Sequence, residues 1–165
     1  MRAPVVGIMG GGVVADEVLA MARQLGSLIA RRGWVLLNGG RDAGVMAASA
    51  QGAKQTGGTV IGVLPDRDTR AASPDLDFAI VTGLGDARNV INVLSSDVVI
   101  ACPGGAGTLS EVALALKNGK PVILLGFEPG PALEAYRQTG QLLTAGDPAD
   151  AVEKAAALLP DTRHP

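Results

Sequence analysis

Short, unbroken apolar runs alternate with longer segments of helical period along the chain. The apolar runs are Val5–Met9, Trp34–Leu37, Thr59–Leu64, Phe78–Val81, Val98–Ala101 and Val122–Leu125. Strands with almost no polar positions are buried on both sides, so the pattern predicts an α/β fold with a parallel sheet between two layers of helices. This is a Rossmann-like, three-layer arrangement. Because the 165 residues contain no internal repeat or linker, one domain is expected over 1–165.

Several residues are typical of helix ends. Three aspartates precede helical segments as candidate N-caps: Asp42, Asp86 and Asp147. Pro148 follows the last of them at the first helical position, which proline favours. Gly33 ends the first helical segment as a C-terminal glycine. Thr108 and Glu111 have the spacing of a capping box, in which the glutamate bonds back to the start of its helix.

Glycines gather where three of the predicted strands end, at 10–12, 39–40 and 104–107. The carboxyl ends of parallel strands share one edge of a sheet, where ligands bind at the switch point. Glycine lets backbone amides approach a ligand, and the amides of a starting helix favour an anion. The clusters therefore predict a phosphate- or nucleotide-binding site. Its candidate residues are Gly11, Gly12, Gly39, Gly40, Arg41, Gly104, Gly105, Ala106, Gly107 and Thr108.

Two charged residues near this edge are candidate catalytic groups. Glu111 lies one turn inside the helix after the third glycine cluster, and Arg88 opens the helix before it. A carboxylate can position water and stabilise an oxocarbenium-like centre, and a guanidinium can hold a phosphate or a departing base. Structural roles stay open for both: Glu111 as the acid of a capping box, and Arg88 as a partner of Asp86 or of solvent.

The first glycine cluster also fits the dinucleotide-binding pattern G-x-G-x-x-A through Gly10, Gly12 and Ala15. That pattern requires an acid at the end of the second strand to bind the ribose, and Asn38 stands there. The helical period also begins late, at Asp16. A binding site for NAD is therefore disfavoured.

Composition argues against several other classes. The net charge of −2 and the scarcity of aromatic residues provide neither a basic surface nor stacking platforms, so nucleic acid is not an expected partner. No segment has the length of a membrane span and no apolar signal core follows Met1, so a cytoplasmic location is expected. Cys102 is the only cysteine and His164 the only histidine. A buried structural thiol and no protein-bound metal are therefore expected.

The segment Pro-Gly-Gly-x-Gly-Thr-x-x-Glu at 103–111, with Gly-Gly-x-x-x-Gly-x-Met at 39–46, resembles the Lonely Guy (LOG) family. That family belongs to a Rossmann-like superfamily often labelled "lysine decarboxylase". The resemblance covers residues 5–126 and implies a site for a nucleoside 5′-monophosphate. In that site Arg88 and Glu111 act at the N-glycosidic bond that LOG enzymes cleave. A pyridoxal-dependent decarboxylase is not expected, because the lysines are predicted on helices or turns away from the glycine edge.

The chain departs from the LOG pattern in two places. The family's Met-His-x-Arg-Lys segment is Gly-Asp-Ala-Arg-Asn at 85–89, and Arg41 replaces the last glycine of the upstream triplet. Arg88-Asn89 and the short length resemble the molybdenum-cofactor-carrier-like branch. Two interpretations follow: a phosphoribohydrolase acting on a nucleoside 5′-monophosphate, or a non-catalytic carrier of a nucleotide or of the molybdenum cofactor, a phosphorylated pterin. Neither requires a resident cofactor. A homodimer or larger homo-oligomer is expected through the helical segments 90–94 and 112–116.

Overall fold

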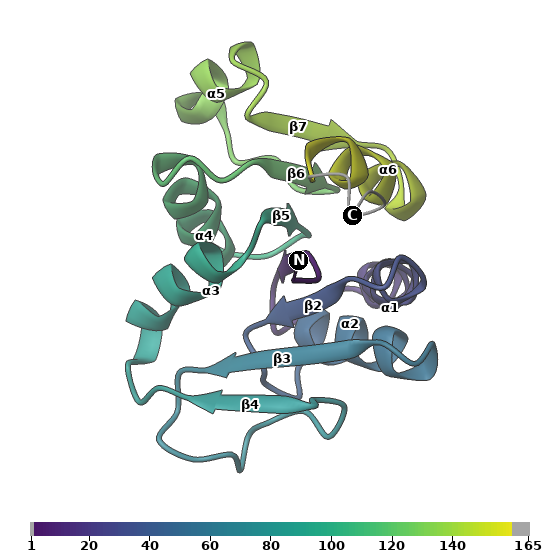
Figure 1. The fold of residues 1–165 in the computed structure, drawn as a ribbon. Helices are drawn as coiled ribbons and strands as arrows, with labels where there is room; N and C mark the ends of the chain where they lie inside the picture. Colours follow the sequence, from purple (N-terminus) through teal and green to yellow (C-terminus); the bar gives the residue numbers. More distant parts are fainter. Residues whose placement is uncertain (1, 160–165) are drawn as a thin grey trace.

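A parallel sheet of seven strands forms the centre of the computed structural model, which describes residues 2–159 (Figure 1). The strands are β1 (Val5–Met9), β2 (Val35–Asn38), β3 (Thr59–Leu64), β4 (Phe78–Val81), β5 (Val98–Ala101), β6 (Val122–Leu125) and β7 (Leu142–Ala145). Their order is β4-β3-β2-β1-β5-β6-β7, and every neighbouring pair is parallel. The predicted Rossmann-like α/β fold is confirmed, and the six apolar runs match six strands to within one residue.

The seventh strand, β7, is the one that the apolar pattern does not predict. Its sequence offers only Leu142 and Leu143 before the polar Thr144. The strand forms by pairing with β6, where Leu142 lies opposite Val122. An edge strand this short depends on the neighbour it pairs with more than on its own residue pattern.

The strand order places a switch point between β1 and β5. The chain moves outward from β1 through β2 and β3 to β4, and then crosses back to β5 on the other side of β1. Val6 of β1 therefore lies opposite Leu36 of β2 and also opposite Val98 of β5. The connections that follow β1 and β5 run to opposite faces of the sheet, which opens a crevice at the carboxyl ends of these two strands.

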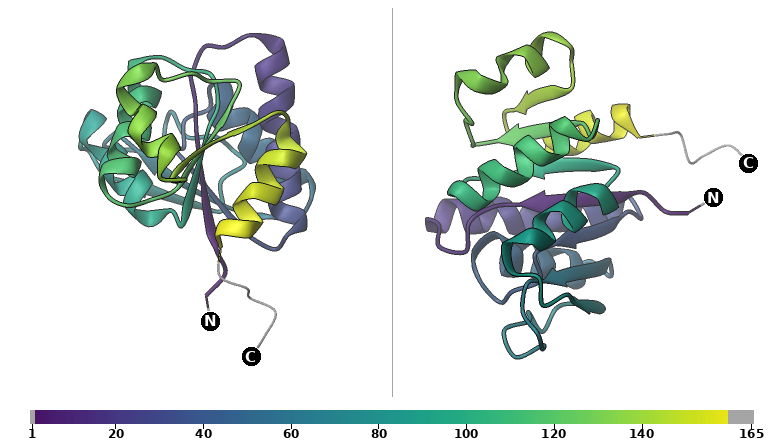
Figure 2. Two further views of the ribbon diagram at one scale, coloured as in Figure 1. Left: turned by 90° about the horizontal axis from the view of Figure 1, so that it is seen from above. Right: turned by 90° about the vertical axis from the view of Figure 1, so that its left-hand side faces the viewer.

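Helices cover the two faces of the sheet as two layers (Figure 2). One layer contains α1 (Asp16–Arg31), α2 (Gly44–Gln55) and α6 (Pro148–Leu158). The other contains α3 (Asn89–Ser95), α4 (Ala106–Lys117) and α5 (Glu134–Gln138), with the 3-10 turns η1 (Gly85–Arg88) and η2 (Pro131–Leu133). Successive residues of β5 enter the two cores in turn: Ile100 packs under the first layer, whereas Val99 and Ala101 pack under the second. This alternation explains why the inner strands are apolar throughout. The edge strand β4 is apolar as well, although all four of its residues are exposed.

No helix in the described part of the chain is both long and apolar enough to cross a membrane.

The helix ends confirm two of the predicted caps and correct two. Gly33, which follows the C-cap residue Arg32 of α1, has a positive φ of 70°. The Asp147 side chain accepts a hydrogen bond from the Asp150 amide at the start of α6. Asp42 does not cap α2, which begins at Gly44 without a side-chain cap. Instead, the second amide of α2 donates to the carbonyl of Gly11 at 3.0 Å. Asp86 lies inside the turn η1 and caps nothing.

The apolar residues of α3 and α4 mostly face the sheet. Val93, Val112 and Leu116 are buried in the core, whereas Leu94 and Leu109 expose 49% and 40% of their surface. The surface proposed for self-association from segments 90–94 and 112–116 is therefore smaller than the sequence indicates. Self-association itself stays a prediction.

Helices α1 and α2 approach each other closely at two glycines. A Cβ atom added at Gly26 would overlap the carbonyl oxygen of Ser49, and one added at Gly52 would overlap the carbonyl oxygen of Arg23. Both atoms belong to helix backbone, which cannot move aside as a side chain can. The two helices therefore pack backbone against backbone, and only glycine fits at the crossing.

We expect Gly26→Ala and Gly52→Ala each to lower the free energy of unfolding by about 1–3 kcal/mol, because the added methyl group overpacks the helix crossing. Gly107→Ala in α4 is the matched control, since a Cβ atom there meets nothing within 4 Å. Relief from the low helix propensity of glycine should make that variant neutral or more stable by up to about 1 kcal/mol. Urea unfolding measures all three. Equal stability of the three variants would contradict the packing argument.

Candidate functional site

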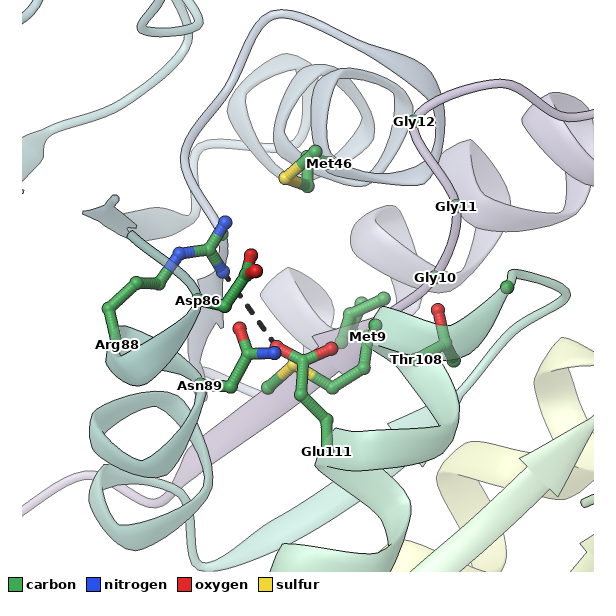
Figure 3. A pocket seen from close by; sticks show the side chains of 14 residues that line it. Met9, Gly10, Gly11, Gly12, Met46, Asp86, Arg88, Asn89, Thr108 and Glu111 are labelled. Carbon is green, nitrogen blue, oxygen red and sulfur yellow. Dashed lines mark ion pairs between the residues drawn. The ribbon is translucent and has the colours of Figure 1, made fainter. Parts of the chain in front are cut away.

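A cavity of about 240 Å³ opens at the carboxyl edge of β1 and β5, at the switch point (Figure 3). Its wall combines bare backbone from glycines with two methionines, an asparagine, a threonine and three charged side chains. The lining residues are Ile8, Met9, Gly10, Gly11, Gly12, Gly39, Met46, Asp86, Arg88, Asn89, Gly105, Gly107, Thr108 and Glu111. All three predicted glycine clusters therefore contribute to one wall.

The glycine segments are fixed to one another through backbone atoms. The Gly11 amide donates to the Pro103 carbonyl at 2.9 Å, and the Gly11 carbonyl accepts from the Val45 amide. Gly39 lies so close to the Met46 sulfur and the Arg88 guanidinium that a Cβ atom would overlap both. Helix α4 begins at the cavity after Gly105, and no side chain caps it. No side-chain acceptor therefore competes for the first amides of α4, which lie at the cavity. These free amides favour an anion there.

Four of the predicted binding residues lie off the cavity wall: Gly40, Arg41, Gly104 and Ala106. Gly40 has a φ of 78°, and its amide donates to the Asn38 side chain at 2.8 Å, so its glycine serves the turn after β2. Arg41 forms two hydrogen bonds with the Asp66 carboxylate, at 3.0 and 2.6 Å. Gly104 packs against Thr108, where a Cβ atom would overlap the hydroxyl oxygen.

Asn38, the residue that disfavours NAD, has a structural role. It is fully buried, and its side-chain amide donates to the Met46 carbonyl at 2.9 Å and to the Ser49 hydroxyl at 3.1 Å. These bonds join the end of β2 to α2 and hold the turn that carries Gly39. Asn38 thus shapes the wall from behind without lining the cavity.

Arg88 and Glu111 meet inside the cavity although they come from different elements. The Arg88 Nη1 atom lies 3.8 Å from Glu111 Oε1, and both side chains are about nine-tenths buried. The Asn92 side-chain amide donates to the same carboxylate at 2.9 Å. Figure 3 shows Glu111 reaching from α4 toward Arg88. The capping-box prediction is therefore wrong: α4 begins earlier than predicted, so Glu111 lies too far along it to reach its first amides.

Burial sets the protonation of this pair. It raises the pKa of Glu111 to about 7, and the donation from Asn92 and the charge of Arg88 only partly oppose the rise. Burial also lowers the pKa of Arg88, against the opposing effect of Glu111. Arg88 Nε and Asn92 Oδ1 are buried and have no hydrogen-bond partner within residues 2–159. A buried guanidinium with an unused N–H is suited to binding an anion, and a carboxyl group that titrates near neutrality can exchange a proton.

Several residues of the site are not predicted from the sequence. Met46 is predicted only as part of a motif, and Asp86 only as a helix cap or a partner of Arg88. Asn92 is not among the predicted residues; it lies off the cavity wall and donates to Glu111. Asn92 stands four positions after Arg88, a spacing that brings two side chains to one face of a helix, so this signal was available. Asn89 donates to the Ser110 hydroxyl at 3.0 Å and links α3 to α4, a contact that only the tertiary structure reveals.

Cys102 is a buried thiol, as predicted, and burial raises its pKa to about 12. It lies off the cavity wall. Among residues 2–159 no group of three or more His, Cys, Asp or Glu side chains is placed to hold a metal ion. His164 lies outside the described residues.

A Rossmann-like sheet with a glycine-walled cavity at its switch point and a buried Arg–Glu pair fits the predicted LOG-like superfamily. The chain belongs to the SLOG cluster4 family, whose model matches residues 3–152. The predicted resemblance is thereby confirmed.

Three relatives show where the chain lies within this superfamily. A molybdenum cofactor binding protein from Rippkaea orientalis is 53% identical with a TM-score of 0.90, over 96% of this chain and 98% of that one. The molybdenum cofactor carrier protein of Chlamydomonas reinhardtii is 48% identical with a TM-score of 0.87, over 95% and 98%. A cytokinin riboside 5′-monophosphate phosphoribohydrolase from Mycobacterium tuberculosis is 37% identical over 66% of this chain, and the match spans only 63% of that relative.

The raised pKa of Glu111 predicts a specific dependence of stability on pH. The folded protein holds this proton up to about pH 7, whereas the unfolded chain releases it near the ordinary value of 4.5. Stability therefore falls as the pH rises from about 4.5 to 7, by about 3 kcal/mol for this one group. Glu111→Gln should remove that contribution, so the loss of stability between pH 5 and pH 8 becomes smaller by about 2–3 kcal/mol.

Urea unfolding at both pH values measures the difference. Glu17→Gln on the exposed face of α1 is the control and should leave the pH dependence of the wild type unchanged. Parallel curves for wild type and Glu111→Gln would contradict the burial argument.

Proposed function

We propose that this chain binds the molybdenum cofactor in the glycine-walled cavity and carries it without changing it chemically. The observation that carries the proposal is a wall of bare backbone that ends at the uncapped start of α4 and faces the largely buried Arg88 across the cavity (Figure 3). This arrangement suits the phosphate of a phosphorylated pterin. The near full-length similarity to two proteins named for this cofactor supports the choice of ligand.

Different residues of the cavity would bind different parts of the ligand. The backbone amides of Gly12 and of the start of α4 would take the phosphate, helped by the partial positive charge of the helix N-terminus. Arg88 adds a full positive charge from the other side of the cavity (Figure 3). The described residues offer no cluster of metal-ligating side chains, so the protein would hold the cofactor through its organic portion. The protein's part is then to bind the organic portion and shield it from water.

Arg88→Gln should weaken binding of the cofactor by at least about tenfold, because a charge-assisted hydrogen bond contributes roughly 1.5–3 kcal/mol. Arg41→Gln is the matched control: it removes the same charge from a residue that is off the wall and paired with Asp66, so affinity should stay within about twofold. Cofactor released from a molybdoenzyme is incubated with each variant, and the retained pterin is measured by fluorescence after oxidation. Loss of binding in the Arg41 variant alone would overturn this arrangement.

A second function is favoured by one observation, a carboxyl group with a pKa of about 7 that faces an arginine inside the cavity. That pair suits hydrolysis of the N-glycosidic bond of a nucleoside 5′-monophosphate. Water would add its hydroxyl to the sugar carbon as the bond to the base breaks, and its proton would go to the departing base. Ionised Glu111 would position the water, and Arg88 would orient the ligand. The similarity to the mycobacterial phosphoribohydrolase supports this candidate.

Release of free base separates the two functions. If the chain is a hydrolase, incubation with AMP or GMP should yield base at a rate that rises with pH through about 7, because Glu111 acts in its ionised form. Glu111→Gln should abolish the release and leave binding in place. Chromatography of the reaction mixture detects the base. Tight binding of the cofactor with no base released at any pH would leave the carrier function as the sole proposal.

A further inference from the structure

The three charged side chains on the cavity wall differ in their hydrogen-bond and ion-pair partners. Arg88 and Glu111 face each other, and Asn92 donates to the glutamate. Asp86 is exposed, and among residues 2–159 no hydrogen bond or ion pair involves its carboxylate. Figure 3 shows the Asp86 carboxylate on the Arg88 side of the cavity, away from Gly10–Gly12 and Thr108. An acidic group that has no hydrogen-bond partner within the described residues, and that lies near the charges of Arg41 and Arg88, therefore lines the part of the cavity opposite the amide wall.

This separation gives the cavity two chemically different ends. The amide wall suits an anion. The other end holds the Arg88 guanidinium together with the Asp86 carboxylate (Figure 3), and that carboxylate repels an anion and accepts hydrogen bonds without donating any. A phosphorylated ligand that places its phosphate on the amides would therefore present a different group to Asp86. Only a group with N–H or O–H donors can satisfy an ionised carboxylate, and two adjacent donors match its two oxygens at once.

We propose that Asp86 selects ligands whose ring carries two adjacent N–H donors, the 2-amino-4-oxo edge that pterin and guanine share. The inference rests on the proposed function, in that it takes this cavity to bind a phosphorylated ring compound. An adenine ring presents one donor beside one acceptor, and hypoxanthine presents the ring N–H but lacks the amino group. Both leave a carboxylate oxygen of Asp86 facing an acceptor or nothing.

Nucleotides that differ only in this edge provide the test. The affinities of GMP, IMP and AMP are measured by isothermal titration calorimetry, with base release monitored in parallel. The wild type should bind GMP about tenfold to a hundredfold more tightly than IMP or AMP, the range expected for a hydrogen bond to a charged group. Asp86→Asn should weaken GMP binding and strengthen AMP relative to GMP, because an amide pairs one donor and one acceptor, as adenine requires.

Two further variants make the result specific. Asp86→Ala should lose the preference for GMP without gaining affinity for AMP. Asp16→Asn removes the same charge from an exposed residue of α1 that is off the wall, and should behave as the wild type. Because Asp86 is exposed and engages no other side chain, its variants should fold, and a thermal melt checks this.

The outcomes separate this inference from the function on which it rests. Equal affinity of the wild type for GMP and IMP, or a GMP preference that survives in both Asp86 variants, would overturn the role of Asp86. In either case binding of a phosphorylated ligand in the cavity would still stand. If none of the three nucleotides and no molybdenum cofactor binds, the proposed function fails, and the role of Asp86 fails with it.

Discussion

The edge of the sheet that carries the cavity depends on one glycine, Gly11, whose amide and carbonyl are both used. The amide donates to the Pro103 carbonyl at 2.9 Å, and the carbonyl accepts from the Val45 amide at 3.0 Å. A single peptide segment thus joins the loop after β1, the loop after β5 and the start of α2. Because these contacts involve backbone alone, they hold the three segments close together without filling the space between them. The cavity exists because the glycine segments on this side of its wall bring no side chains into it.

The buried Arg–Glu pair is the second feature on which the site depends. Neither Arg88 nor Glu111 is fully satisfied by its neighbours, since the closest approach of the two side chains is 3.8 Å and Arg88 Nε has no partner in the described structure. Such a pair costs stability, and the cores on both sides of the sheet must offset that cost. The same incomplete pairing leaves the arginine able to bind an anion and the glutamate able to titrate near neutral pH. The incomplete pairing therefore lowers the stability of the fold while it leaves both side chains available to a ligand.

The fold could be predicted from the sequence more completely than the site. Strands such as β5 are buried on both faces, and their unbroken apolar runs indicate this burial directly. Among the strands only the edge strand β7 is not predicted, because its formation depends on β6. The short helix α5 is not predicted either. Glycine clusters at strand ends likewise predicted where the cavity lies. The sequence could not distinguish glycines on the wall from those behind it, since Gly39 and Gly40 are adjacent yet serve different purposes.

The remaining differences have one physical origin. The sequence predicts Arg41 as a phosphate-binding residue, whereas the structure pairs it with Asp66. The sequence offers Glu111 as a helix cap, whereas the carboxylate bonds to Asn92. In both cases the partner lies on another element, and residue spacing reports only contacts within one element. The same limit applies to Asn92 and Asp86, whose importance depends on what the fold brings opposite them.

The backbone construction of the wall has a consequence for how this site can diverge. Backbone amides are present whatever the side chains are, so substitutions leave the anion-favouring end intact as long as the glycines remain. The opposite end is made of side chains, among them Met46 and Asp86, each of which a single mutation can replace. Related proteins can therefore come to bind a ligand with a different ring system while they bind its phosphate in the same way. In this architecture, a new ligand preference requires changes at only one side of the cavity.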